Sequence, residues 1–169
     1  MKKLGLFLGA IALAVFAGAV GYQALAAGNS KQEITDLEHK CIAATSTEQS
    51  ESLGCFDPSD IVLYDFIPPL EYSGAKEVRA DLNNFFNNAK DVKGEFLQLA
   101  VVTDGKLGIA RSIQHFTWTS KDGKPMAATF RVTDALHKTG GKWKIFHTHV
   151  SVPVNPETDK GEMDLKLNS

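Results

Sequence analysis

Two histidines near the end of the chain are the first side chains whose spacing suggests chemistry. They belong to a run of alternate positions, which reads Trp143, Ile145, His147, His149 and Ser151. Alternate side chains of a β-strand share one face, so this face would begin apolar and end polar. Two imidazoles on one face can chelate zinc or copper, or can hydrogen-bond a polar ligand.

A metal at these histidines needs a further ligand, and the candidates are His115, Asp65 and Asp134. No spacing singles out any of them, and two histidines alone do not complete a tetrahedral site. The alternative is that both imidazoles hydrogen-bond partners inside a polar pocket. We therefore predict a ligand pocket without a metal and without a cofactor.

The strand before this run carries Arg131 and Thr133, and the turn at Thr139-Gly140-Gly141 brings it against the histidines. A loop of three residues would place both side chains opposite the two imidazoles, a set suited to a carboxylate or another small polar ligand. A loop of two residues would shift the register by one. The side chains presented would then be Val132, Asp134 and Leu136.

Asp65 is the strongest candidate for acid-base chemistry. It ends an apolar run and precedes Phe66. Apolar neighbours raise the pKa of a carboxyl group, and such a carboxylate can serve as a general base. The alternative is a structural Asp that caps the strand end before Pro68-Pro69.

The part of the chain that precedes the strands is predicted to be mainly helical, apart from one short strand. Ser30 and Glu33 fit a capping box, and apolar residues at helical spacing predict a helix over about 31–46. The polar stretch after it predicts a short helix around 48–53. A single apolar stripe predicts a further helix over about 75–89.

Strands and turn signals fill the remainder of the chain. Runs rich in β-branched and aromatic residues predict strands at 61–66, 96–102, 107–119, 126–138 and 142–152. The turn signals are Asp104-Gly105, Asp122-Gly123 and Gly140-Gly141. Helices followed by antiparallel strands predict an α+β fold, in which the helices cover the concave side of a curved sheet and leave a pocket at one end.

Length and charge restrict the function classes. The 169 residues, 43% of them hydrophobic, predict one domain over 27–155 with a polar C-terminal tail over 156–169. The formal net charge is -2 and the Lys and Arg residues are scattered, which argues against nucleic acid as a partner.

The N-terminus has the layout of a secretory signal peptide over 1–26. Lys2 and Lys3 precede an uncharged apolar run, and Ala24-Leu25-Ala26 provides small residues for cleavage after Ala26. The mature protein would be periplasmic or secreted, with no attachment to the membrane. The alternative is an uncleaved anchor, because the apolar run is almost long enough to span a bilayer.

Cys41 and Cys55 are the two cysteines of the chain. An even number of cysteines in an oxidising compartment favours a disulfide over two buried thiols. The bond would close a loop of about 15 residues, which is worth roughly 3 kcal/mol in the chain-entropy model.

The order of these elements resembles the SnoaL-like branch of the nuclear transport factor 2-like superfamily, over about 31–155. That superfamily includes ketosteroid isomerases, dehydratases, polyketide cyclases and non-catalytic binding modules. The stretches that carry the resemblance are Tyr64-Asp65-Phe66-Ile67-Pro68-Pro69, Gly74, Arg131-Val132-Thr133, and Gly141-Lys142-Trp143-Lys144-Ile145 with His147, His149, Ser151 and Pro153.

The resemblance implies a cone-shaped, cystatin-like α+β fold, a homodimer formed through the outer sheet face, and the three-residue register of the last hairpin. Asp65 stands where ketosteroid isomerases hold the Asp that removes a proton beside a carbonyl. The place of their oxyanion-binding Tyr falls near Cys41, and that of their second acid near Lys138 and Thr139. The isomerase set is therefore incomplete.

We expect an exported domain that binds a small polar or carbonyl-bearing ligand. The predicted ligand-binding residues are Arg131, Thr133, His147, His149, Tyr64 and Trp143. An alternative is a cofactor-free isomerase, dehydratase or cyclase, in which Asp65 or His147 moves a proton. A third possibility is a dimeric interaction module with a vestigial pocket.

Overall fold

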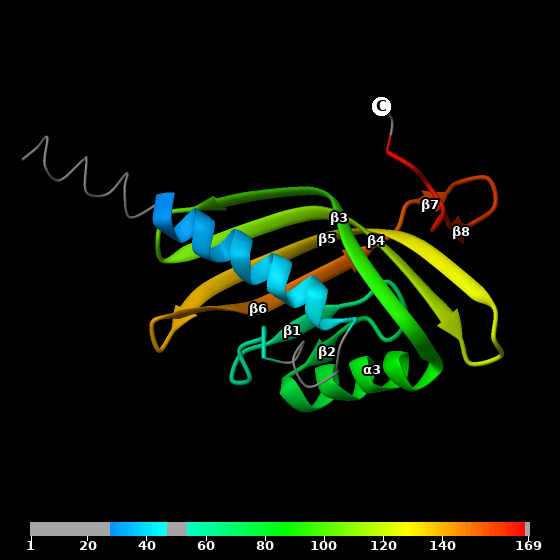
Figure 1. Cartoon of the computed structure of the whole chain (residues 1–169), viewed down its shortest axis with the longest axis horizontal. Helices are drawn as coiled ribbons and strands as arrows, with labels where there is room; N and C mark the ends of the chain where they lie inside the picture. Colours follow the sequence, from blue (N-terminus) through cyan, green and yellow to red (C-terminus); the bar gives the residue numbers. More distant parts are fainter. Residues whose placement is uncertain (1–27, 47–53, 168–169) are drawn as a thin grey trace, which may run out of the picture.

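The computed structural model describes residues 28–46 and 54–167, and its first element is a long helix (Figure 1). This N-terminal helix ends at residue 44, and residue 28, the first described residue, already lies within it. Because residues 28–30 are already helical, Ser30 does not cap the helix, and the predicted capping box is wrong. Ser30, Ile34 and Glu38 are instead spaced by four, and all three are buried on the face that meets the sheet.

One curved sheet forms the body of the protein, in the strand order β2-β1-β6-β5-β4-β3. Its strands are β1 (Val62–Tyr64), β2 (Tyr72–Ser73), β3 (Ala89–Thr103), β4 (Leu107–Ser120), β5 (Pro125–Thr139) and β6 (Lys142–Ser151). Neighbouring strands are antiparallel except β1 and β6, which are parallel. The predicted α+β class is therefore correct.

The second helix that faces the sheet is α3 (Ala75–Asn88), which ends where β3 begins. Gly74 precedes it with φ 82, a backbone conformation that glycine adopts at little cost. Glu77 Oε2 accepts a hydrogen bond from the Ser73 N–H at 2.8 Å, which fixes the entry to the helix. Figure 1 shows the N-terminal helix crossing the long strands and α3 lying at one end of the sheet.

The hairpin between β5 and β6 has a two-residue loop. Gly140 and Gly141 have φ values of 58 and 78, and Thr139 pairs with Lys142. Two consecutive positive φ values match the tight turn whose twist suits adjacent strands, and glycine favours it at both positions. The three-residue loop favoured from the family resemblance is therefore wrong.

A β-bulge then shifts β6 against β5. Leu136 pairs with Ile145, whereas its neighbour on β5, Ala135, pairs with His147. Phe146 is therefore an extra residue on β6. An extra residue reverses the facing of every side chain beyond it. Before the bulge Ile145 is buried, and after it Thr148 is buried. The alternating run from Trp143 to Ser151 therefore does not stay on one face. Trp143 and Ile145 lie before the bulge on the buried face, and His147 and His149 lie after it on the opposite face.

The core fills the closed end of the cone. Ile34, Leu136, Trp143 and Ile145 belong to one cluster there, and Leu136 and Ile34 are fully buried. A Cβ on Gly108 would lie 2.5 Å from Ile34 Cδ1, so this glycine lets the N-terminal helix approach β4 closely.

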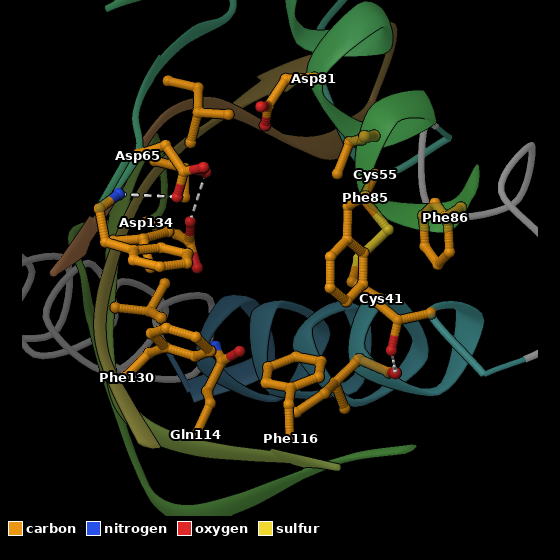
Figure 2. Close-up of a pocket in the computed structure, with 18 of the residues that line it drawn as sticks. Cys41, Cys55, Asp65, Asp81, Phe85, Phe86, Gln114, Phe116, Phe130 and Asp134 are labelled. Atoms are coloured by element: carbon orange, nitrogen blue, oxygen red, sulfur yellow. Dashed lines mark hydrogen bonds between the residues drawn. A yellow bond between two sulfur atoms is a disulfide. The ribbon is translucent and has the colours of Figure 1, made fainter. Parts of the chain in front are cut away.

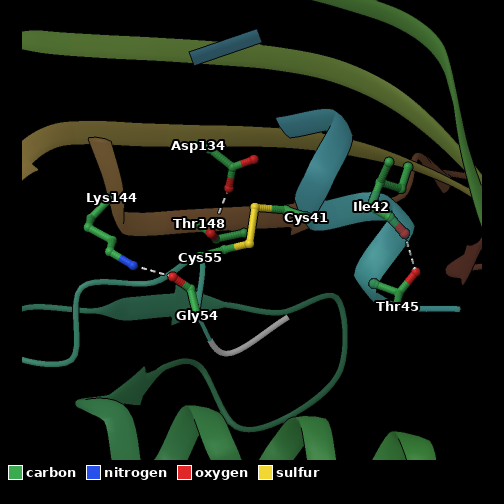
Figure 3. The surroundings of a disulfide bond; sticks show 8 residues. All are labelled: Cys41, Ile42, Thr45, Gly54, Cys55, Asp134, Lys144 and Thr148. Carbon is green, nitrogen blue, oxygen red and sulfur yellow. Dashed lines mark hydrogen bonds between the residues drawn. A yellow bond between two sulfur atoms is a disulfide. The ribbon is translucent and has the colours of Figure 1, made fainter. Parts of the chain in front are cut away.

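The predicted disulfide between Cys41 and Cys55 is present, with the two Cα atoms 6.0 Å apart (Figure 3). It ties the N-terminal helix to the segment that precedes β1. The short helix predicted around 48–53 lies outside the described residues, as does the predicted signal peptide. Within the described ranges, no helix is long and apolar enough to cross a membrane.

The segment after Cys55 is held by a buried carboxylate. Asp57 is 2% exposed and lies 2.7 Å from His137 Nε2, while its Oδ2 accepts the Thr139 hydroxyl at 2.6 Å. Its Oδ1 accepts the Ser59 hydroxyl and N–H. These hydrogen bonds, from Ser59 first, hold the pKa of Asp57 far below its usual range.

The chain beyond β6 contains the short strands β7 (Val154–Asn155) and β8 (Lys160–Gly161). It returns to the sheet at β5, where the Thr129 N–H donates to the Met163 carbonyl at 2.6 Å. The polar tail predicted over 156–169 is therefore hydrogen-bonded to the domain through residue 163.

Candidate functional site

A cavity of about 440 Å³ lies between the N-terminal helix, α3 and the concave face of the sheet. Figure 2 shows its labelled side chains arranged around the opening. Most of the lining is apolar and much of it is aromatic. The aromatic residues are Phe56, Phe66, Phe85, Phe86, Phe96, Phe116, Trp118 and Phe130.

Two carboxyl groups meet inside this cavity. Glu38 comes from the N-terminal helix and is 3% exposed, and Asp134 comes from β5 and is 4% exposed. Both line the cavity, and their carboxyl groups lie close enough together for the charge of Asp134 to act on Glu38. The Thr148 hydroxyl donates to Asp134 Oδ1 at 2.6 Å. No hydroxyl, amide or cationic donor among the described residues reaches Glu38 Oε1.

Burial controls the charge of this acid pair. Removal from water, and then the nearby charge of Asp134, raises the pKa of Glu38 from 4.5 to about 9. Burial also raises the pKa of Asp134, although the Thr148 hydrogen bond opposes the rise. At neutral pH the pair therefore shares one proton, with Glu38 as its principal holder.

A second pair of carboxyl groups, Asp65 and Asp81, also lines the cavity. Asp65 follows β1 and accepts a hydrogen bond from the Phe66 N–H at 2.7 Å. Burial raises its pKa from 3.8 to about 6, with a smaller contribution from the charge of Asp81 on α3. Burial raises the pKa of Asp81 as well, while a hydrogen bond from Tyr72 opposes this.

The disulfide forms part of the same wall. Cys41 lies one helical turn after Glu38, and both cysteines line the cavity. The covalent link to Cys55 therefore holds the part of the helix that carries Glu38. Gln114, on β4, adds a buried amide that donates to the Ser112 hydroxyl at 2.9 Å.

Of the residues predicted from sequence, Asp65 lines the cavity. The predicted ligand-binding residues do not line the cavity. For His147 and His149 the reason is the bulge, which turns the side chains beyond it to the other face of β6. Arg131 and Thr133 are exposed on the outer sheet face, and Arg131 donates to the Val152 carbonyl at 2.9 Å. The expectation that they face the pocket is wrong, and their ability to bind a ligand stays a prediction.

Tyr64, His147 and His149 do come together, but outside the cavity. The Tyr64 ring centroid lies 4.7 Å from that of His147 and 6.0 Å from that of His149. His147 Nδ1 is 3.0 Å from the Val62 carbonyl oxygen. No group of three or more metal-ligating side chains occurs in the part of the chain that the structure describes.

Trp143 belongs to the closed end of the core. It is 6% exposed, and its Nε1–H donates to Glu33 Oε2 at 2.8 Å. Lys138 lies 5.3 Å from the centre of the indole ring and also pairs with Glu33. Trp143 therefore packs as a core residue and does not line the cavity.

The sequence analysis did not identify Glu38 or Asp81. It named Asp134 only as a possible metal ligand and as a side chain that a two-residue loop would present. A signal for Glu38 was available, since it lies four residues after Ile34 and three before Cys41, within the apolar stripe of the helix. Asp134 alternates with Val132 and Leu136 in a buried row. A carboxyl group inside an apolar pattern is a sequence signal for a buried site.

Comparison with known proteins identifies the family and the fold of this chain. The family model for the SnoaL-like domain matches residues 35–155. No curated protein matches significantly. An NTF2-like protein of unknown function from Pseudomonas putida KT2440 is 25% identical, with a TM-score of 0.74 over 83% of this chain and 98% of that chain.

Two further solved structures share the fold. A ketosteroid isomerase-like protein from Erwinia carotovora atroseptica is 18% identical, with a TM-score of 0.61 over 72% of this chain and 94% of its own. A putative dehydratase from the NTF2-like family, from Streptomyces avermitilis, is 12% identical, with a TM-score of 0.66 over 74% of this chain and 97% of its own.

Proposed function

We propose that this chain, which belongs to the SnoaL-like domain family of the NTF2-like superfamily, binds a small and largely apolar molecule in its cavity. A volume of about 440 Å³ is in the range of small-molecule pockets. The apolar and aromatic lining supplies the affinity, and the few polar groups orient the ligand.

The observation that carries this proposal is the Glu38–Asp134 pair. Burial of a carboxyl group without a donor costs free energy, and protein cores seldom contain such a group without a reason. Glu38 Oε1 has no such donor in the described structure, and its carboxyl group faces an apolar cavity. A polar group of a bound ligand would satisfy this oxygen.

A thermal-shift screen tests the binding function. The probes are small aromatic molecules of equal size that differ in one polar group: an alcohol, a ketone, a carboxylate and an amine. We expect at least one of them to raise the melting temperature of the wild type, because a ligand that binds the folded state stabilises it.

A matched pair of variants locates the binding in the cavity. Val150 lines the cavity, whereas Val102 is exposed on the outer sheet face. Val150→Phe should abolish the shift by filling the cavity, and Val102→Phe should keep it. If no probe stabilises the wild type, or if both variants respond equally, the cavity is not the binding site.

A second candidate function is proton transfer at Asp65. The observation that favours it is the position of Asp65 in the cavity with a pKa of about 6, close to the range that suits a general base. The test is exchange of deuterium at the acidic carbon of an activated ketone, followed by NMR. Asp65→Asn should abolish the exchange, and equal rates in the two proteins would remove Asp65 from this role.

We also propose that the outer sheet face forms a homodimer. Val102 and Ile109 are paired on β3 and β4, Leu107 lies beside Ile109 on the same face, and all three are at least 45% exposed. Light scattering after size exclusion should give twice the monomer mass for the wild type and the monomer mass for Ile109→Glu. A monomeric wild type would contradict the proposal.

Export is the remaining part of the proposal, and the Cys41–Cys55 disulfide supports it, because such bonds persist in oxidising compartments. We propose that residues 1–26 are a signal peptide and that the mature protein begins at Ala27. Fractionation of a bacterial host and N-terminal sequencing of the exported protein test this. Retention of residues 1–26 on the folded protein would favour the membrane-anchored alternative.

A further inference from the structure

We propose that the ligand of the cavity is an organic cation, an ammonium group carried on an aromatic or aliphatic body. This inference rests on the binding function proposed above and names its ligand class. Among the described residues, every ionisable side chain that lines the cavity is an acid, and none is a Lys, Arg or His. The acids are Glu38, Asp65, Asp81 and Asp134.

The acid pair has the hydrogen-bonding pattern that an ammonium group requires. A carboxylate only accepts hydrogen bonds, whereas an alkylammonium offers three donors and no acceptor. Glu38 Oε1 has no hydroxyl, amide or cationic donor among the described residues, and Asp134 receives the Thr148 hydroxyl on one oxygen. A ketone brings no donor to Glu38, and a carboxylate ligand would bring a further negative charge to the pair.

An ammonium group can take the place of the proton that the pair now shares. When the ammonium group binds, the shared proton leaves to solvent and both carboxyl groups are ionised, and the cation between them restores the net charge of the pair that the proton had given it. The resulting hydrogen bonds are charge-assisted on both sides, which makes them the stronger class. A bare metal ion is a poorer fit, because the described residues contain no cluster of three metal-ligating groups.

The second acid pair adds negative charge to the same cavity. Asp65 and Asp81 lie close enough together that the charge of Asp81 contributes to the raised pKa of Asp65. Carboxylates on the wall of an apolar cavity focus the field within it and raise the local concentration of cations. The same field disfavours anionic ligands of equal shape.

The aromatic lining suits the body of such a ligand and also its charge. Phe116 and Phe130 lie with ring centroids 6.1 Å apart, and Phe85 lies 5.9 Å from Trp118. In Figure 2 the rings of Phe85, Phe116 and Phe130 surround the space that the carboxyl groups of Asp65, Asp81 and Asp134 border. Aromatic faces attract cations as well as apolar groups, so these walls do not oppose an ammonium group.

Isothermal titration calorimetry with three probes of similar shape tests the inference. The probes are 2-phenylethylamine, 2-phenylethanol and 3-phenylpropanoate, added to the disulfide-bonded wild type. We expect the amine to bind at least about tenfold more tightly than the alcohol, the size of effect expected for a hydrogen bond to a charged group. The carboxylate should bind most weakly.

Two isosteric variants assign the preference to the acid pair. Glu38→Gln and Asp134→Asn each remove one negative charge, and Asp36→Asn removes an exposed carboxylate from the same helix as a control. We expect either cavity variant to lower the amine affinity about tenfold or more while the alcohol affinity changes little. The control should bind all three probes as the wild type does.

The outcomes separate the two proposals. If the alcohol or the carboxylate binds as tightly as the amine, the cavity binds ligands but the cation inference is wrong. If the amine preference survives in both cavity variants, the acid pair does not create it, and the inference is again wrong. If none of the probes binds and the wider screen also finds none, the binding function itself fails.

Discussion

Replacement of Glu38 by Gln should remove a large pH dependence of the stability of this protein. The folded state raises the pKa of Glu38 from 4.5 to about 9, chiefly through burial. Between these values the folded protein holds a proton that the unfolded chain has released. The free energy of unfolding must therefore fall as the pH rises through this window. The contribution of Glu38 to stability is largest at the low-pH end, where the folded protein keeps the proton.

The size of the effect follows from the proton count. One extra proton in the folded state changes the free energy of unfolding by about 1.4 kcal/mol per pH unit. From about pH 6.5 to about pH 8.5 the wild type should therefore lose roughly 3 kcal/mol through this residue. The window lies above the pKa of about 6 of Asp65, so the titration of that residue contributes little.

The amide introduced by Glu38→Gln keeps the shape of the side chain and a donor toward Asp134, but it cannot ionise. Urea unfolding at both ends of the pH window measures the free energy of unfolding of each protein. Between the low and the high pH, the free energy of unfolding of the variant should rise relative to that of the wild type by roughly 3 kcal/mol. Asp36→Asn, an exposed carboxylate on the same helix, should keep the wild-type slope. Parallel pH profiles for Glu38→Gln and the wild type would refute the reasoning.

Other predictions follow from the rest of the fold. Replacing Cys41 and Cys55 by Ala should lower the free energy of unfolding by about 3 kcal/mol, given their separation of 14 residues, and urea titration with and without reductant checks it. Asp57→Ala should cost about 1–3 kcal/mol at neutral pH, because the donors on Ser59, His137 and Thr139 lose their acceptor. Because its folded pKa is lowered, this contribution is present above the ordinary value of 3.8 and should disappear as the pH falls below it, as acid unfolding curves will show. Gly94→Ala should cost about 1–3 kcal/mol by thermal melting, because the new Cβ would lie 2.5 Å from the Phe116 ring.

The fold could be predicted from the sequence because its signals are local. Hairpin turns at Gly105 and Gly123, both with positive φ, and amphipathic stripes on two helices are visible without tertiary information. The start of the N-terminal helix was misplaced, since Ser30 has the chemistry of a cap but lies within the helix and is buried. The type of a residue alone therefore does not show that it occupies the capping position of a helix.

The site could be predicted only in part, because it depends on register. A one-residue loop difference and the bulge at Phe146 decide which face of β5 and β6 meets the cavity, and neither is specified by alternation alone. Asp65 was found because it directly follows its strand. Glu38 and Asp134 are distant in sequence, and their pairing is a property of the folded cone.

The central claim, that a ligand binds in the acid-lined cavity, has a direct test in the two tryptophans of the chain. Trp118 lines the cavity, whereas Trp143 lies in the core with its indole N–H bonded to Glu33. In a ¹H–¹⁵N NMR titration with 2-phenylethylamine, we expect the Trp118 indole signal to move in a saturable manner and the Trp143 signal to stay in place. A titration in which neither signal moves, or in which the Trp143 signal moves alone, would contradict the account.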